Sequence, residues 1–81
     1  MTRLEVRNLP VGQLRGYLVD ELAGVADGDT VRGDGWAVRF IQGEPVRLRL
    51  MTIAVLFIEI EGAREDEIAA FMRNKTMRGG G

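Results

Sequence analysis

The sequence contains no cysteine, no histidine and no serine, and its only lysine is Lys75. The chain therefore cannot form a disulfide, assemble a Ser-His-Asp or Cys-His nucleophile system, or build a zinc site from thiolate and imidazole ligands. Lys75 stands near the end of a predicted helix, where a cation complements the helix dipole. Since carboxylates are the main reactive groups left, we predict that the protein is not an enzyme acting alone.

Long apolar runs are also missing. The longest, residues 50–58, has about half the length that a membrane-spanning helix needs. Charge begins at Arg3, before any apolar segment typical of a signal peptide, so we predict a cytoplasmic protein. The net charge of −1 argues against a dedicated nucleic-acid binder. Amide side chains are scarce and arginine far exceeds lysine, a composition that a heat-adapted source or a GC-rich genome would each produce.

Acidic and glycine-rich stretches are the candidates for a metal site. A calcium loop that began at Asp27 would need oxygen ligands at residues 31 and 38, and both are valine. We therefore interpret residues 27–29 and 33–35 as turns, and the acidic residues 65–67 as the first turn of a helix. No metal or cofactor site is predicted.

Alternation and helical spacing predict one domain with the element order β-α-β-β-β-α. Residues 2–9 alternate as a half-buried strand, and apolar residues recur at helical spacing from 11 to 25. Residues 30–32 and 36–42 predict a hairpin, because the intervening Gly33-Asp34-Gly35 suits a tight turn. Gly62 separates the last strand from a second helix that ends near Met77. An antiparallel sheet with both helices on one face gives a two-layer α+β domain over residues 1–77. Residues 78–81 are predicted to be a flexible glycine tail.

Residues 46–61 are predicted to form one unusually long strand. No Gly, Asn, Asp or Pro is available for a tight turn near residues 53–55, so we interpret the segment as a single strand, bent near Thr52. One face of this strand is apolar throughout and belongs to the core. The other face has Arg at one end, Glu at the other and apolar residues between: Arg47, Arg49, Met51, Ile53, Val55, Phe57, Glu59 and Glu61.

That second face predicts a homodimer. Covering each of its four apolar side chains is worth roughly 1.5–3 kcal/mol, and two helices can cover only one face of the sheet. Around a two-fold axis at Ala54, Arg47 would meet Glu61 and Arg49 would meet Glu59 of a second copy, which is the self-complementarity that a two-fold contact requires. We therefore expect a homodimeric interaction or scaffold module that uses edge pairing or face packing. The alternative is that the middle of the strand crosses the protein's own core.

Two other binding functions remain open. The open face of the sheet carries arginines that could contact the phosphates of nucleic acid or of another anion, namely Arg3, Arg7, Arg39, Arg47 and Arg49. Neighbouring glutamates could instead pair with these arginines across the strands. A pocket between the helices and the sheet, beside Trp36 and Tyr17, could carry a small ligand.

The sequence closes with Arg78-Gly79-Gly80-Gly81. This ending resembles that of the ubiquitin-like sulfur carriers, chains of this size that end in Gly-Gly and whose exposed carboxylate is adenylated by a partner. In those carriers, which have a β-grasp fold, a strand runs into the tail, whereas a helix is predicted here. The resemblance implies a carrier function, and the alternative is that three glycines are simply a flexible chain end.

Overall fold

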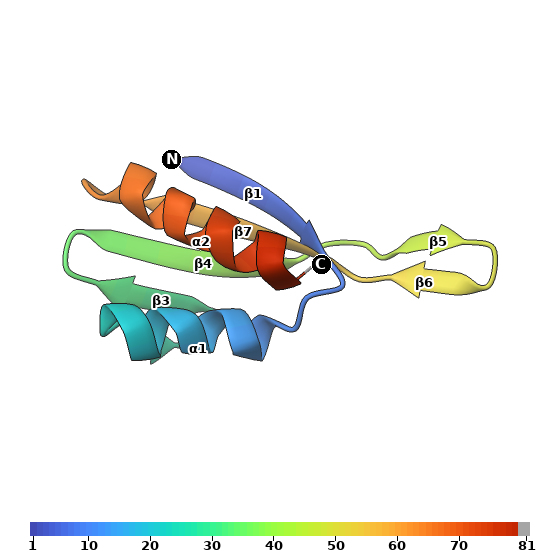
Figure 1. The fold of residues 1–81 in the computed structure, drawn as a ribbon, viewed down its shortest axis with the longest axis horizontal. Coiled ribbons are helices and arrows are strands. Elements are labelled where there is room, and N and C mark those ends of the chain that lie inside the picture. Colours follow the sequence, from blue (N-terminus) through green and yellow to red (C-terminus); the bar gives the residue numbers. More distant parts are fainter. Residues whose placement is uncertain (80–81) are drawn as a thin grey trace.

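A five-stranded antiparallel sheet, in the order β1-β7-β4-β3-β2, forms one layer of the computed structural model, which describes residues 1–79 (Figure 1). Two helices lie together on one face of this sheet and form the second layer. The predicted two-layer α+β architecture is therefore confirmed. The strands are β1 (Thr2–Arg7), β2 (Val25–Asp27), β3 (Thr30–Gly33), β4 (Trp36–Gln42) and β7 (Val55–Glu61), and the helices are α1 (Val11–Leu22) and α2 (Glu65–Gly79).

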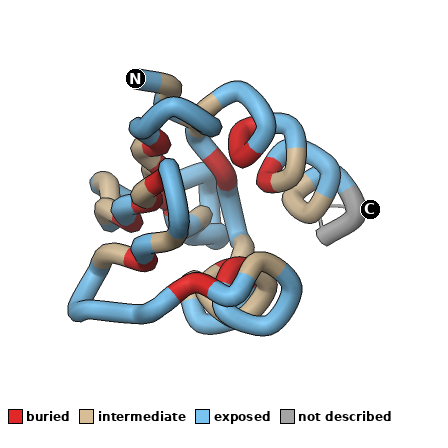
Figure 2. The backbone as a smooth tube through the Cα atoms, turned by 90° about the vertical axis from the view of Figure 1, so that its left-hand side faces the viewer, coloured by how far each residue is buried: buried red, intermediate tan, exposed pale blue. Residues whose placement is uncertain are grey.

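The core lies between the sheet and the helices, where Figure 2 shows the buried segments gathered. The period-2 pattern of β7 points Leu56, Ile58 and Ile60 toward the helices, as predicted, and its other residues toward the open face. Helical spacing directs the buried residues of α1 and α2 back onto the same layer. The buried side chains from these two helices are Leu14, Leu18, Ile68, Ala69 and Met72.

Residues 46–61 do not form one strand, so the prediction of a single long strand is wrong. β5 (Val46–Leu48) and β6 (Met51–Ile53) pair with each other as a separate two-stranded hairpin, and Ala54 separates this hairpin from β7. The element order is therefore β-α-β-β-β-β-β-α. The chain reverses at Arg49 and Leu50, with Arg49 in the left-handed conformation at φ 56°. This conformation is usually taken by Gly, Asn or Asp, so no residue of the usual turn type marks the turn in the sequence.

Two smaller differences concern the element ends. β2 is a short edge strand over residues 25–27, where the sequence predicted the end of a helix and the start of a turn. α2 continues to Gly79, so the first two residues of the predicted flexible tail are helical. The rest of that tail, residues 80 and 81, lies outside the described residues. Within residues 1–79, neither helix has both the length and the apolar character that crossing a bilayer would require.

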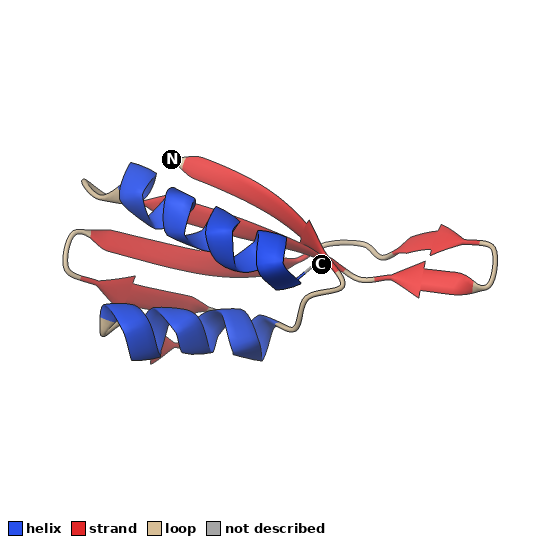
Figure 3. Cartoon of the chain, viewed as in Figure 1, coloured by secondary structure: helices blue, strands red, loops and turns tan. Residues whose placement is uncertain are grey.

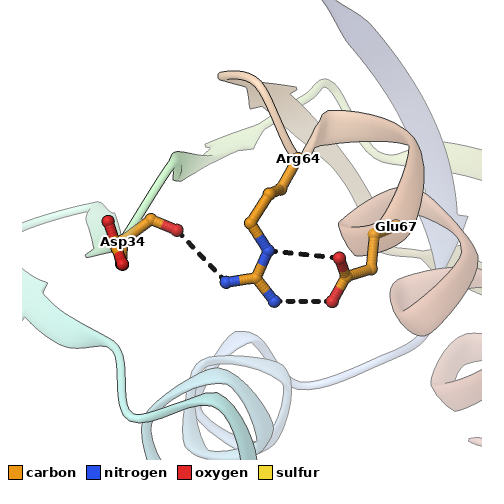
Figure 4. A network of polar contacts seen from close by, with 3 residues as sticks. All are labelled: Asp34, Arg64 and Glu67. Carbon is orange, nitrogen blue, oxygen red and sulfur yellow. Dashed lines mark hydrogen bonds and ion pairs between the residues drawn. The ribbon is translucent and has the colours of Figure 1, made fainter.

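The start of α2 is held to the sheet by a network at the end of the molecule opposite the β5–β6 hairpin (Figures 1 and 4). The Arg64 guanidinium donates two hydrogen bonds to Glu67, at 3.1 and 2.5 Å, and a third to the carbonyl of Asp34 at 3.2 Å. Glu65 accepts a hydrogen bond of 2.7 Å from the Thr2 hydroxyl and forms an ion pair of 3.2 Å with the α-amino group of Met1. These contacts join α2 to the β3–β4 turn and to β1.

The same contacts lower two carboxyl pKa values. The pKa of Glu65 falls below its ordinary value mainly because the Thr2 hydroxyl donates to its carboxylate, with a further contribution from the α-amino group. The pKa of Glu67 falls because Arg64 donates to its carboxylate. The folded state therefore holds these two carboxyls ionised to lower pH than the unfolded state does.

We expect acid to weaken the fold through these two residues. Because both pKa values are depressed, their contribution is fully present above the ordinary Glu value of about 4.3 and is lost as pH falls through the folded-state values. Thermal unfolding between about pH 6 and pH 3 should show a shallower loss of Tm in the Glu65→Gln/Glu67→Gln variant than in the wild type. Glu44→Gln is the control, because Glu44 forms no ion pair within residues 1–79. An unchanged slope in the double variant would contradict the prediction.

Candidate functional site: the projecting hairpin and the C-terminal glycines

The β5–β6 hairpin projects from the body along the longest axis of the molecule, which measures 43 Å (Figure 3). Its root is fixed on both sides. The backbone N–H of Asn8 donates to the carbonyl of Ala54 at 3.0 Å, and the Asn8 side-chain oxygen accepts from the N–H of Ala54 at 3.3 Å. The N–H of Gly43 donates to the carbonyl of Val55 at 2.9 Å. The hairpin is therefore an arm whose root is attached to the body.

The hairpin has one apolar and one polar face. In an antiparallel pair, directly opposed residues share a face, and the register opposes Val46 with Ile53 and Leu48 with Met51. These four side chains form the apolar face, and Arg47 opposite Thr52 forms the polar face. We call the four residues of the apolar face, together with Leu50 at the turn, the hairpin patch.

The hairpin patch is open to solvent. Leu50 is fully exposed, Met51 is 60% exposed and Leu48 is 54% exposed. Figure 3 shows both helices confined to the five-stranded sheet, so no helix within the described residues covers the hairpin. An isolated two-stranded hairpin is marginally stable in water, and clustered exposed apolar side chains often mark a contact surface. The patch is therefore the strongest candidate for a binding surface.

The hairpin is also cationic, whereas the rest of the chain is acidic. Residues 45–58 contain Arg47 and Arg49 and no carboxylate. All twelve acidic and nine of the eleven basic side chains lie elsewhere, giving the other residues a formal charge of −3. Arg47 and Arg49 make no ion pair within residues 1–79. The hairpin thus combines an apolar face with two arginines that have no ion-pair partner among the described residues.

The predicted dimer interface is divided by the hairpin turn. Arg47 and Arg49 lie on the polar face and at the turn, while Met51 and Ile53 belong to the hairpin patch. The remaining four residues lie on the open face of the sheet, on β7: Val55, Phe57, Glu59 and Glu61. The proposed pairing about Ala54 required one continuous strand, so that register is wrong. Homodimerisation by another contact stays a prediction.

The arginines expected on the open face are distributed over two places. Arg3 lies 3.8 Å from Glu59 and stacks its guanidinium 4.3 Å from the centre of the Phe57 ring. Arg7 pairs with Glu5 at 3.1 Å, and Arg39 pairs with Asp29 at 3.6 Å. The other two arginines of that set, Arg47 and Arg49, lie on the hairpin. The expected neutralisation by carboxylates is therefore present on the sheet, which weakens the case for phosphate binding there. Nucleic-acid binding stays an untested alternative.

A depression of about 720 Å³ occupies the open face over β3, β4 and β7. Both charge signs line it, with Arg32 and Arg39 on one side and Glu59 and Glu61 on the other. The sequence had suggested a pocket on the opposite face, beside Trp36 and Tyr17. Trp36 is buried in the core and also borders the depression on the open face, and Tyr17 packs against the core. Within residues 1–79, no three carboxylates come close enough together to hold a metal ion.

Lys75 joins the last part of α2 to α1. Lys75 forms an ion pair of 2.8 Å with Glu21, and its ammonium lies 4.8 and 5.4 Å from the ring centres of Tyr17 and Phe71. This lysine bridges α1 and α2, a role beyond the dipole complement that the sequence suggested. Beyond it, Met77 is exposed, and α2 runs toward the end of the body from which the hairpin projects (Figure 1). The described end of α2, at Gly79, therefore lies at the hairpin end of the body.

Comparison with curated proteins returned no match. A protein-family model described as "Archaeal MoaD-like protein" matches residues 2–81, a span that includes the hairpin, both helices and the three closing glycines. A match over nearly all of the sequence shows that the chain belongs to the archaeal MoaD-like protein family.

Proposed function

We propose that the protein is a small sulfur carrier whose Gly81 carboxylate is activated by a partner enzyme. The observation that carries this proposal is the coincidence of two features. The chain belongs to a MoaD-like family, and its sequence closes with the glycines that resemble the tail of ubiquitin-like sulfur carriers. The absence of cysteine, histidine and serine fits a protein that is modified rather than one that catalyses.

The chemistry needs only the carboxylate of this chain. A carboxylate oxygen of Gly81 attacks the α-phosphorus of ATP, the bond from that phosphorus to the bridging oxygen breaks, and pyrophosphate leaves. Hydrosulfide then attacks the carbonyl carbon of the mixed anhydride. AMP leaves, and the chain retains a thiocarboxylate. The partner would supply the nucleotide site and the sulfur source, while this chain presents a glycine tail that carries no side chains.

The helical approach to the tail affects how that carboxylate is presented. Six residues follow Lys75, whose side chain joins α2 to α1. As a helix they would span about 9 Å, and fully extended they would span about 20 Å. Unwinding the last turn of α2 would give the tail this reach. Gly79 has the lowest helix propensity of any residue except proline, which makes that turn easier to unwind.

Intact mass spectrometry tests the proposal. The full chain is incubated with Mg-ATP, sulfide and the adenylating enzyme that serves sulfur carriers in the source organism. We expect AMP release and a mass increase that corresponds to replacement of one oxygen by sulfur, localised to the last peptide. A chain without Gly80 and Gly81 is the matched control and should stay unmodified. A wild-type chain that releases no pyrophosphate and gains no sulfur would contradict the proposal.

Self-association is the second candidate, as expected from the sequence. The observation that favours it is the exposed hairpin patch, because oligomerisation is a common way to cover such a surface in a small domain. Sedimentation equilibrium of the wild type and of Met51→Glu tests it. A dimer that dissociates in the variant would support this candidate, and a monomeric wild type would exclude it.

A further inference from the structure

We propose that the β5–β6 hairpin is the docking arm for the enzyme that acts on the glycine carboxylate, and that it binds an apolar groove bordered by carboxylates on that enzyme. This inference rests on the carrier function proposed above and names the surface that would select the partner. It is carried by the apolar face, the charge and the position of the hairpin.

The apolar face gives the arm its contact surface. Leu48, Leu50 and Met51 are all more than half exposed, and they lie at the outer end of the hairpin. Val46 and Ile53, nearer the root, are partly buried and continue the same face inward. A groove that received the outer end would bury all three exposed side chains together, as the centre of a specific interface does.

The charge of the hairpin selects the kind of partner. If two copies packed hairpin against hairpin, Arg47 and Arg49 would have no carboxylate from residues 45–58 of either copy to pair with. Such a contact would leave these four positive charges at the border of the interface with no opposite charge from either hairpin. A groove with carboxylates at its border would instead pair both arginines and guide the approach of the arm. Charge therefore favours an acidic partner over a second hairpin.

The position of the hairpin relates it to the tail. α2 runs toward the end of the body from which the hairpin projects, and the glycines follow α2 (Figure 1). At the opposite end, the network of Arg64 and Glu67 holds the start of α2 to the β3–β4 turn (Figure 4). A partner bound to the hairpin would thus face the end of the body that presents the tail. The partner enzyme would therefore bind the hairpin and reach the glycine tail from the same end of the molecule.

Steady-state kinetics of AMP release with the adenylating enzyme test the inference. We expect Leu50→Glu and Met51→Glu to raise the KM for the carrier about 10- to 30-fold, because each removes an apolar anchor of the interface. Arg47→Glu should raise KM and also reduce its dependence on salt. Deletion of Gly80 and Gly81 should abolish AMP release while leaving the affinity measured by titration within about threefold of the wild type.

The matched controls make the same kinds of substitution on the five-stranded sheet instead of on the hairpin. Val25→Glu alters a side chain that is 69% exposed, similar to Met51, but lies on β2 of the sheet. Arg32→Glu makes the same charge reversal as Arg47→Glu on β3, where Arg32 makes no ion pair within residues 1–79. Both controls should keep the wild-type KM. Because every substituted residue is exposed, the denaturation midpoints of all the variants should match the wild type.

Several outcomes would overturn the inference. If the wild type and the hairpin variants are activated with the same KM, the carrier function stands and the proposal of a docking arm is wrong. If the wild type is never adenylated, both the carrier function and the docking arm are wrong. A dimer that dissociates in Met51→Glu would assign the patch to a second copy. Binding of the wild type, but not of Leu50→Glu, to anionic phospholipid vesicles without binding to the enzyme would assign it to a membrane surface.

Discussion

Val55→Arg is expected to destabilise the folded protein by about 2–4 kcal/mol, because it places a cation where the side chain is only 6% exposed. Val55 lies on β7 directly opposite Arg7, so the new charge would also face a like charge across the strand pair. Gly43 lies beside Val55 on the neighbouring strand end, since its N–H donates to the Val55 carbonyl and a methyl on it would lie 3.2 Å from the Val55 side chain. Urea denaturation followed by Trp36 fluorescence measures the loss.

Leu50→Arg is the matched control, because Leu50 is fully exposed at the hairpin turn. Its free energy of unfolding should stay within about 0.5 kcal/mol of the wild type. Protein concentration separates the monomer explanation from a dimer explanation. If the substitution destabilises the monomer, the urea midpoint falls by the same amount at every protein concentration. If it removes a dimer contact, the midpoint falls more at high concentration. A stable Val55→Arg protein would mean that Val55 is not covered by its own chain.

Val55 was assigned to a dimer interface because residues 46–61 were interpreted as one strand. The hairpin turn changes which of these residues share a face. In one continuous strand, Val46 and Leu48 would lie opposite Met51 and Ile53. A two-residue turn shifts the alternation by one position, so that all four lie on one face of the hairpin. The predicted interface therefore mixed residues of the hairpin patch with residues of the open sheet face. Only the chain reversal at Arg49 separates them, and Arg49 is not a residue type that signals a turn.

Other parts of the fold followed from local pattern. The Asp34-Gly35 turn was predictable because glycine reaches positive φ without strain, and Gly35 has φ 81°. The inward face of β7 was predictable from strict alternation, which places Ile58 and Ile60 in the core. The burial of Val55, which is 6% exposed although it lies on the open face, was not predictable from alternation. Sequence patterns specify the faces of an element but not what packs on them.

The candidate site was likewise predictable in part. The glycines were visible in the sequence, and the helix that precedes them was predicted and is confirmed up to Gly79. The apolar content of residues 46–58 was visible too, and it indicated a contact surface. The sequence did not predict that this surface lies on a projecting hairpin that is separate from the five-stranded sheet. The missing information is the conformation of one residue, Arg49, whose left-handed backbone costs only about 1–2 kcal/mol.

Gly62→Ala is expected to destabilise the protein by about 2–5 kcal/mol, since the substitution combines backbone strain with a steric clash. Gly62 has φ 118°, a conformation that residues with a Cβ atom rarely adopt. A methyl group there would lie 2.8 Å from the Cα of Trp36 and closer still to the carbonyl oxygen of Gly35. That oxygen accepts the N–H of Arg64 at 3.0 Å, so relief of the clash would disturb the start of α2.

Gly12→Ala is the control for Gly62→Ala, because it makes the same change where nothing lies within 4 Å of the new methyl. Gly12 is in α1, where alanine has the higher helix propensity, so the variant should be more stable than the wild type by about 0.5–1 kcal/mol. The two variants should therefore shift the urea midpoint in opposite directions. Equal shifts would mean that the junction between β7 and α2 tolerates a side chain. In that case α2, and with it the direction in which the tail leaves the body, would be less firmly fixed than the contacts of Arg64 imply.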